Sequence, residues 1–424
     1  MAALSQNKID GLGGRAESMV NALGAISAEP DRLVRLFLTP EHRRAADRVA
    51  EWMRQAGLEV SEDALGIVRG RLNGPNRRLL IGSHIDTVID AGKYDGPFGV
   101  IAGILAAEHF ARAGKRLPFG IDVLAFGDEE GSRFPATLSS SSACAGIFKS
   151  EMLSQADRNG VTLADAIAAY GKSPADIPAA AYGRGEAAAY VELHIEQGPV
   201  LESRNQPLGI VTAIIGQTYL NIEFLGEAGH AGTVPMSMRR DALAGAAEGM
   251  LLGERLARET KGEVVATVGR IAVVPGAANV IPGNVAVIFD IRSGSEAARA
   301  KFAAALKASI RDIADRRRLS LSITSTREVP TTPCHPVIQD QLAGAIRALG
   351  AEPLWLGSGA GHDGQAMAKL CPIGMLFVRC RGGISHNPME YASPRDLGLA
   401  VAALIGFIGR FDPEKLGPAP QASA

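Results

Sequence analysis

The sequence predicts an α/β protein of two domains, in which a two-layer α+β domain is inserted into a domain built on a partly parallel sheet. Residues 79–85 and 121–126 are apolar runs of strand length, and residues 98–113 between them are alanine-rich and long enough for a helix. A strand, a helix and a strand of these lengths form a βαβ unit with parallel strands. In residues 211–330 the pattern changes, because long β-rich stretches alternate there with two helices. The sequence therefore separates a βαβ-containing domain from an inserted α+β domain.

The pattern of apolar residues predicts helices and strands in the rest of the chain and places them in one of these two domains. Outside the insertion, helical spacing of apolar residues at 15–57 and 393–411 predicts helices, and apolar runs predict strands at 188–195 and 373–379. Within the insertion, β-rich runs occupy residues 210–215, 219–225, 263–274 and 285–292, and helical periodicity covers residues 241–261 and 295–318. We therefore expect the first domain to comprise residues 1–210 and 331–424, and the inserted domain to comprise residues 211–330.

Composition and charge restrict the class of protein. Hydrophobic residues make up 46% of the 424 residues and charged residues 21%, which is enough apolar material for ordinary globular cores. The net charge of -1 and the lack of a basic block argue against a nucleic-acid partner, and no apolar run reaches the length of a membrane span. Residues 1–14 are polar and lack the apolar core of a secretion signal. The four cysteines are scattered without paired spacing, so we expect reduced thiols in a cytoplasmic protein.

Polar residues of the metal-ligand type follow the two strands of the βαβ unit. His84, Asp86 and Asp95 lie at or beyond the end of the first strand, and Glu129 and Glu130 follow the second. Ligands gather where parallel strands end. Converging carboxylates repel one another unless a positive charge lies among them, and a histidine with several carboxylates suits two divalent metal ions that share a bridging carboxylate. The alternative is a solvated acidic loop tip with a chance histidine.

The strand at 188–195 carries a further polar face. Side chains alternate along a strand, so Glu192, His194 and Glu196 point to the same side. An exposed sheet edge is one explanation of this pattern. A strand end that carries ligands is the explanation that we favour, because the strand is otherwise apolar.

Later stretches place single polar residues in turns and at strand ends. These residues are His230 between glycines, Asn279 in a turn, Arg292 at a strand end and His386 after the strand at 373–379. Each of them alone is also typical of a surface turn. His362 and Asp363, in a glycine-rich turn, are open between a structural role and a supporting role at the site.

Nine motifs occur in order along the chain. They are GSHIDTV, KYDGPFGV, DEEGSRF, ELHIEQGPVLE, GHAGTVPM, RRDAL, NVIPG, GSGAGHDG and GGISHNP. Together they resemble the hydantoinase/carbamoylase amidases, a branch of the zinc-dependent aminoacylase and carboxypeptidase superfamily. This branch holds N-carbamoyl-L-amino acid hydrolases, β-ureidopropionases and allantoate amidohydrolases. The resemblance extends from about residue 15 to residue 412.

The resemblance implies a zinc exopeptidase-like catalytic domain, with a mixed sheet and helices on both faces, and an inserted lid domain that also mediates homodimerisation. It implies two divalent metal ions in each subunit. By motif, His84 and His194 bind one ion, Glu130 and His386 bind the other, and Asp95 bridges both. Histidine and carboxylate ligands fit zinc, manganese, cobalt or nickel.

The resemblance also implies roles for the residues around the ions. Asp86 would orient His84 by accepting a hydrogen bond from its other ring nitrogen, and Glu129 would be the general base that activates the attacking water. A cis peptide bond is expected between Asp95 and Gly96. The histidine at position 194, where the aminoacylase relatives often have a carboxylate, points to the branch that acts on ureido substrates.

A second group of residues matches positions that bind substrate in the family. These are Gln197, His230, Asn279, Arg292, Gly359 and Ala360. Arg292 suits the substrate carboxylate, because its planar fork donates two hydrogen bonds. His230 would polarise the ureido carbonyl and is expected to reach across from the partner subunit. Backbone N–H groups of the glycine-rich turn would bind the same carboxylate as Arg292.

The sequence thus predicts a metal-dependent amidohydrolase that cleaves the carbamoyl C–N bond of an N-carbamoyl amino acid or related ureido acid and releases ammonia and carbon dioxide. Within the family, an allantoate amidohydrolase and an N-acyl amino acid deacylase or peptidase are alternatives. A serine amidase would use Ser139–Ser142 with Lys149, but no matching glycine-rich signature follows. A non-catalytic metal-binding protein is a further alternative, although every proposed ligand and the base are present.

Overall fold

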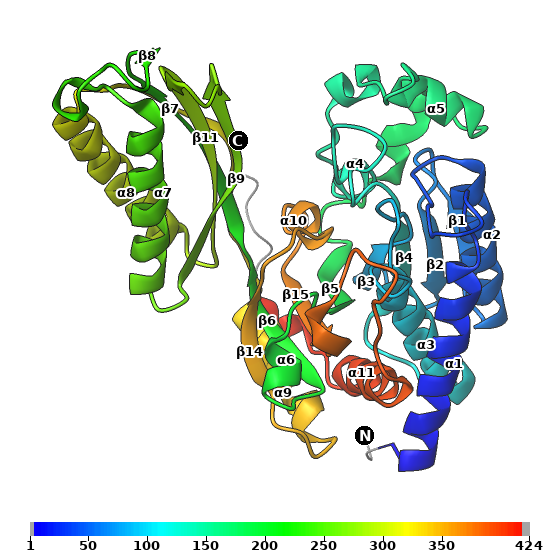
Figure 1. Ribbon diagram of the computed structural model, residues 1–424. Helices are drawn as coiled ribbons and strands as arrows, with labels where there is room; N and C mark the ends of the chain where they lie inside the picture. Colours follow the sequence, from blue (N-terminus) through cyan, green and yellow to red (C-terminus); the bar gives the residue numbers. More distant parts are fainter. Residues whose placement is uncertain (1–3, 418–424) are drawn as a thin grey trace. The chain divides into compact units, whose positions relative to one another are not determined.

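The chain divides into two compact units (Figure 1). The computed structural model describes residues 4–417, so residues 1–3 and 418–424 of the predicted first domain lie outside the described residues. The larger unit contains the described residues up to Thr212 and those from Pro333 onward, and the smaller unit is Ala213–Thr332. Among residues 4–417, no helix is both long and apolar enough to cross a membrane.

The larger unit is built on a mixed sheet of nine strands. In spatial order the strands are β1 (Glu59–Glu62), β2 (Val68–Leu72), β4 (Gly120–Phe126), β3 (Arg78–His84), β5 (Ala187–Ile195), β15 (Ile373–Val378), β6 (Leu208–Ile214) and β13 (Thr332–Pro333), with β14 (Leu354–Ser358) paired to β6. The four central strands β4, β3, β5 and β15 are parallel, and β2 and β6 flank them in antiparallel orientation. The predicted mixed α/β fold is confirmed.

Helices connect and cover these strands. The α-helices of the larger unit are α1 (Gln6–Gly24), α2 (Pro40–Gln55), α3 (Pro97–Ala113), α4 (Ser139–Cys144), α5 (Leu163–Ala169), α6 (Val200–Ser203), α9 (Pro336–Arg347), α10 (Gly364–Met367) and α11 (Pro394–Ile408). Short 3₁₀ helices are η1 (Ser150–Ser154), η2 (Pro174–Ala180), η4 (Arg381–Gly383) and η5 (Pro413–Leu416). The starts of α2 and α11 follow from local chemistry, because Thr39 and Ser393 cap them and a proline occupies the first helical position.

The predicted βαβ unit is β3, α3 and β4. Its strands are parallel, with His84 opposite Phe126. Almost all of α3 is buried, and it ends at Gly114, whose φ of 59° is accessible to glycine at little cost.

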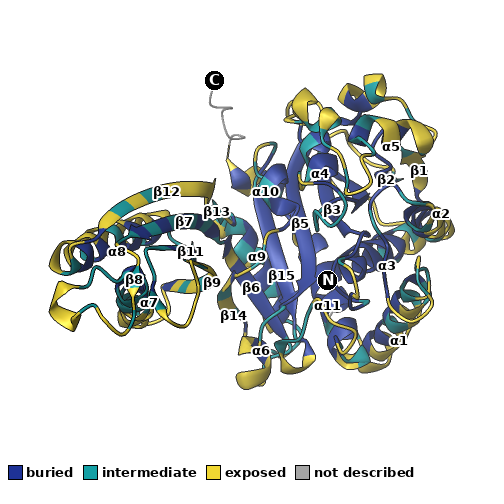
Figure 2. Ribbon diagram, turned by 45° about the horizontal axis from the view of Figure 1, so that its top comes forward, coloured by how far each residue is buried: buried dark blue, intermediate teal, exposed yellow. Residues whose placement is uncertain are grey.

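Side chains alternate between the two faces of the sheet along the central strands. Ile81, Val191 and Leu376 join one apolar core with residues of α1, α3 and α11. The intervening residues Glu192 and His194 therefore point to the opposite face. Because β5 lies between β3 and β15 and is buried along its length (Figure 2), its polar residues do not lie at an exposed edge.

The smaller unit has two layers. Its antiparallel sheet has the order β12 (Ser320–Val329), β7 (Gly216–Leu225), β11 (Asn284–Ser293) and β9 (Val264–Val274). Helices α7 (Ala242–Glu259) and α8 (Glu296–Arg317) form the second layer, and Phe224, Phe289, Leu306 and Ile310 lie in the core between the layers. A two-stranded ribbon of β8 (Gly229–His230) and β10 (Val280–Ile281), with the 3₁₀ helix η3 (Met236–Met238), lies outside this sheet.

The buried ring of His42 makes the larger unit sensitive to acid. Its Nδ1 lies 3.1 Å from the Tyr170 hydroxyl, and its ring meets the edge of Phe37. Burial lowers the pKa of His42 from 6.5 to about 4. Between these values the unfolded chain takes up a proton that the folded chain does not, so stability falls as the pH falls from 6.5 to 4, by at most about 3 kcal/mol.

We expect His42→Gln to reduce this loss. Urea unfolding of metal-free protein at pH 7 and at pH 4.5 measures it, and the difference in the free energy of unfolding should be smaller in the variant than in the wild type. His109→Gln is the comparison: His109 is partly exposed, and burial also lowers its pKa, so this variant should reduce the difference less than His42→Gln does. Equal differences in all three proteins would contradict this assignment.

Candidate metal centre

Four parallel strands bring their polar ends together. His84 ends β3, Glu129 and Glu130 follow β4, His194 is the residue before the end of β5, and His386 lies in the segment after β15. Because the carboxyl ends of parallel strands meet at one edge of a sheet, these side chains converge although they are far apart in sequence.

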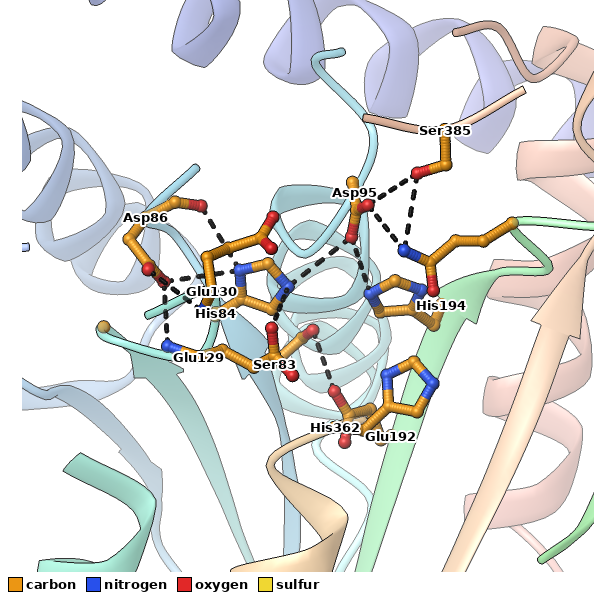
Figure 3. A network of polar contacts seen from close by, with 12 residues as sticks. Ser83, His84, Asp86, Asp95, Glu129, Glu130, Glu192, His194, His362 and Ser385 are labelled. Carbon is orange, nitrogen blue, oxygen red and sulfur yellow. Dashed lines mark hydrogen bonds and ion pairs between the residues drawn. The ribbon is translucent and has the colours of Figure 1, made fainter. Parts of the chain in front are cut away.

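The converging side chains form two triads that share one carboxylate. Figure 3 shows the first of them, made by His84, Asp95 and His194. The ligand atoms of His84, Asp95 and His194 lie within 4.8 Å of one another, and so do those of Asp95, Glu130 and His386. Asp95 Oδ1 is 3.6 Å from His84 Nε2 and 3.0 Å from His194 Nε2. Asp95 Oδ2 is 3.2 Å from His386 Nε2, which is 3.4 Å from Glu130 Oε2. Each oxygen of Asp95 therefore faces a different triad.

The donor set fits divalent metal ions. His194 is 1% exposed, yet its Nε2 makes no hydrogen bond with the described residues despite its short distance to Asp95. Buried polar atoms are nearly always paired, so an unpaired nitrogen aimed at a carboxylate indicates a missing positive partner. Imidazole nitrogens with carboxylate oxygens are ligands that divalent zinc, manganese, cobalt and nickel accept.

The second ring nitrogens of the buried histidines are held by their neighbours. His84 Nδ1 lies 3.2 Å from the carbonyl oxygen of Asp86 and 3.4 Å from its Oδ1. His194 Nδ1 lies 2.9 Å from the carbonyl oxygen of Ile195. When the rings are neutral, donation from Nδ1 to these oxygens leaves Nε2 of both rings unprotonated toward Asp95, which is the tautomer that a metal ligand needs. The Asp86 carboxylate also accepts the N–H groups of Glu129 and Glu130 and so ties the β3 end to the β4 end.

The charges of the cluster are strongly coupled in the metal-free protein. Although burial acts in the opposite direction, the histidines His194, His386 and His84 hold the pKa of Asp95 well below its usual range. Burial and the Asp95 charge raise the pKa of Glu130 to about 7, and the hydrogen bond with Asp95 raises the pKa of His386 to about 9. Protons thus occupy positions that divalent ions would take, and metal binding must release them.

Glu129 lies beside the triads rather than within the shared pair. Its Oε2 is 3.9 Å from His84 Nε2, and burial raises its pKa well above the usual value for glutamate. Asp128 before it and Gly131 after it have φ values of 68° and 60°. The ligand atoms of Glu129 and Glu130 nevertheless lie within 4.8 Å of each other and of a ring nitrogen of His84, so these three residues form a further candidate metal-binding group.

The serines of α4 are engaged in structural hydrogen bonds. The Ser139 hydroxyl donates to the buried Asp128 carboxylate, and the Ser140 hydroxyl donates to the carbonyl oxygen of Gly127. A nucleophilic serine needs a base that accepts its proton. Both hydroxyls support the turn before Glu129, and among the described residues neither is hydrogen-bonded to Lys149, so the geometry gives the serine amidase alternative no support.

The residues predicted to bind substrate from the larger unit lie near the triads. Gln197 Nε2 donates to Asp95 Oδ2 at 2.7 Å. The N–H of Ala360 donates to Ser358 Oγ at 3.3 Å, so this group is already engaged in the structure. Ser358 Oγ also lies 2.6 Å from His362 Nε2, and the His362 ring meets the ring of His194 at 4.6 Å between centroids. His362 thus packs directly behind a predicted ligand.

The other predicted substrate residues belong to the smaller unit. His230 lies in β8 opposite Val280, and Ala231 donates its N–H to the carbonyl oxygen of Asn279, so the two predicted residues share one ribbon. Gly232 donates its N–H to His230 Nδ1 at 3.0 Å. Arg292, in β11, forms an ion pair with Asp290 on the same strand face, with 2.8 Å between Nη2 and Oδ2.

Comparison with known proteins identifies the family. Residues 80–410 match peptidase family M20/M25/M40. The chain belongs to peptidase family M20/M25/M40. It is therefore a metal-dependent hydrolase.

Relatives within this family bear more specific names. The chain is 41% identical over 386 residues to N-carbamoyl-L-amino acid amidohydrolase of Geobacillus stearothermophilus, which covers 90% of this chain and 94% of the relative. It is 39% identical to allantoate deiminase of Arabidopsis thaliana, over 93% of this chain and 81% of the relative. A crystal structure of a hydantoinase/carbamoylase family amidase from Burkholderia multivorans is 31% identical, with a TM-score of 0.87 over 97% of this chain and 98% of that one. The resemblance to the hydantoinase/carbamoylase amidases is confirmed.

The sequence did not single out two residues of this M20 site, and it misplaced one feature. Ser385 and Glu390 flank His386 and contact the Asp95 segment. A glutamate between the apolar residues Met389 and Tyr391 is the signal that could have drawn attention to Glu390. Among the described residues, the one cis peptide bond is Val274–Pro275, so the expected cis bond at Asp95–Gly96 is wrong. Gly96 instead turns the chain with a φ of 79°, which glycine adopts readily.

Proposed function

We propose that this protein hydrolyses the carbamoyl C–N bond of an N-carbamoyl-L-amino acid or a related ureido acid, with release of ammonia and carbon dioxide. The observation that carries the proposal is the pair of triads that share Asp95, with a histidine at position 194 and Glu129 alongside. The N-carbamoyl-L-amino acid amidohydrolase and allantoate deiminase relatives, at 41% and 39% identity, support the substrate class.

The proposed cofactor is a pair of divalent metal ions, zinc, manganese, cobalt or nickel. His84 and His194 would hold one ion, Glu130 and His386 the other, and Asp95 both. When bound, such ions supply Lewis acidity and lower the pKa of water.

Glu129 would transfer the proton, and His230 would stabilise the charge that forms on the carbonyl oxygen. Glu129 would take a proton from the attacking water as its oxygen adds to the carbamoyl carbon, and would pass that proton to the leaving ammonia nitrogen as the C–N bond breaks. The carbamate that remains on the amino acid nitrogen would then lose carbon dioxide to give the free amino acid. The N–H of Gly232 points at His230 Nδ1, which makes Nδ1 an acceptor and leaves the hydrogen of the neutral ring on Nε2. The Nε2–H group of His230 is suited to stabilise the oxyanion that forms from the ureido carbonyl.

The substrate would be held by Gln197, Asn279, Arg292 and the backbone at Gly359 and Ala360. Arg292 would bind the substrate carboxylate, and its Nε and Nη2 donate to Asp290, which fixes the plane of the guanidinium. We further propose a homodimer formed through the smaller unit, in which the partner subunit supplies His230. Four buried free cysteines are in keeping with a reducing, cytoplasmic location.

Allantoate is the second candidate substrate, because the allantoate deiminase relative aligns over 93% of this chain. An N-acyl amino acid deacylase or peptidase of the same family is less favoured, since His194 takes the position where those relatives often have a carboxylate.

The deciding experiment is an ammonia-release assay on metal-stripped enzyme, with and without added manganese, cobalt, nickel or zinc. The panel contains N-carbamoyl-L-amino acids, N-carbamoyl-β-alanine, allantoate and an N-acetyl amino acid. We expect metal-dependent ammonia from at least one ureido acid, and the best substrate then specifies the reaction. Cleavage of the acetyl compound without ammonia from any ureido acid would overturn the proposal in favour of a deacylase.

A further inference from the structure

Glu390 connects the two segments that carry Asp95 and His386. It is 3% exposed, and its Oε1 accepts the N–H groups of Tyr94 at 2.7 Å and Asp95 at 3.1 Å. Its Oε2 lies 3.0 Å from Ser385 Oγ. A buried carboxylate thus fixes the backbone of the bridging residue on one side and a serine hydroxyl on the other.

The chain is shaped to admit this side chain. A Cβ atom at Gly92 would lie 2.3 Å from Glu390 Cδ, so no larger residue fits at position 92 beside Glu390. On the other side, Glu390 donates its N–H to the carbonyl oxygen of Asn387, and Asn387 Oδ1 accepts the N–H of Met389. This turn returns Glu390 to the side of Ser385, five residues earlier.

Ser385 transmits this anchoring to the shared carboxylate. Its Oγ lies 2.6 Å from Asp95 Oδ2, as Figure 3 shows. A hydroxyl offers one hydrogen and can donate to one carboxylate at a time, and Asp95 is the nearer of the two. Ser385 contacts only the oxygen of Asp95 that serves one metal position. This oxygen, Oδ2, faces Glu130 and His386, whereas Oδ1 faces the two buried histidines.

We propose that Ser385 and Glu390 form a positioning pair that sets the direction of Asp95 Oδ2 and thereby the affinity of one metal position, that of Glu130 and His386. The terminal torsion of aspartate is broad, so donors to Oδ2 set its direction, and Ser385 at 2.6 Å supplies one of them beside Gln197 Nε2 at 2.7 Å. Groups that orient ligands in this way commonly change metal affinity or activity 10–100-fold. The inference rests on the proposed two-ion site but is independent of which substrate is cleaved.

Metal titration of the stripped full-length protein with manganese or zinc tests the proposal. We expect the wild type to bind two ions, and Ser385→Ala and Glu390→Gln to weaken one binding event about 10–100-fold while the other stays unchanged. His386→Ala identifies the affected event, because it removes a ligand of that position alone. Ser385→Thr keeps the hydroxyl and should restore the affinity. The variant that carries both Ser385→Ala and Glu390→Gln should bind metal as tightly as the single variant with the lower affinity, since both residues act through one contact.

Glu202→Gln is the matched control for a general loosening of the segment. Glu202 Oε2 accepts the N–H of Gly382 at 2.7 Å, in the same segment as Ser385, and among the described residues it forms no hydrogen bond or ion pair with Asp95. We expect it to keep both affinities. Equal weakening in Glu202→Gln, or two unchanged affinities in Ser385→Ala and Glu390→Gln, would overturn the inference and leave the ureido reaction standing. A wild type that binds fewer than two ions would overturn the inference together with the two-ion site.

Discussion

Replacement of Glu129 by glutamine should lower kcat by about 10²–10⁴-fold, the usual contribution of a general base. The amide keeps the size of the side chain and removes its ability to accept a proton. Glu129 Oε2 lies 3.9 Å from His84 Nε2; Glu129 belongs to neither triad that shares Asp95, although it forms a further group with His84 and Glu130. Because the variant keeps all members of the two triads, we expect it to retain metal, which elemental analysis checks, and steady-state kinetics should show the loss in kcat with KM nearly unchanged.

Glu130→Gln distinguishes this role from that of a ligand. Glu130 is adjacent in sequence, but its Oε2 faces His386 in the second triad. We expect the Glu130 variant to lose metal, with activity that recovers in part at higher metal concentration. Activity of Glu129→Gln close to that of the wild type would show that another group takes the proton.

The other large effect is expected from Asp95→Asn, which should cost both metal ions. Asp95 is the one residue common to the two triads, and each of its oxygens faces a different set of histidines. The neutral amide removes the negative charge that both positions share and replaces one oxygen with an NH₂ group that cannot ligate. Elemental analysis after dialysis should show loss of both ions, and ammonia release should fall to background.

Asp86→Asn is the comparison for this experiment. Asp86 Oδ1 lies 3.4 Å from His84 Nδ1, and the same carboxylate accepts the N–H groups of Glu129 and Glu130, so its variant should weaken metal binding about 10–100-fold without removing a ligand. Two retained ions in Asp95→Asn would refute the shared carboxylate.

The sequence predicted those site residues that lie at the ends of the central strands. Apolar runs locate β3, β4, β5 and β15, and the polar residues that end them must meet once the strands are parallel. Periodicity along the chain therefore predicted that His84, Glu130 and His194 come together. It predicted the two-layer smaller unit for the same reason, since its strands and helices are long and regular.

The periodicity of the sequence could not predict the contacts that Ser385 and Glu390 make with the Asp95 segment. Ser385 and Glu390 lie almost three hundred residues after Asp95, in an irregular segment with no period to reveal which way a side chain points. The expected cis bond failed for a related reason, because the glycine at position 96 offers a second way to make the same turn.

The position of β15 has a consequence for how the protein is made. This strand lies between β5 and β6 in the sheet, yet it is synthesised after the whole smaller unit. Until residue 378 leaves the ribosome, β5 and β6 expose apolar, unpaired edges, while residues 213–332 already form a complete core. Until β15 is made, the nascent chain therefore presents strand edges that can mispair. His84, Asp95 and His194 precede β15 in the sequence, but His386 follows it, so we expect the position of Glu130 and His386 to be completed after that of His84 and His194.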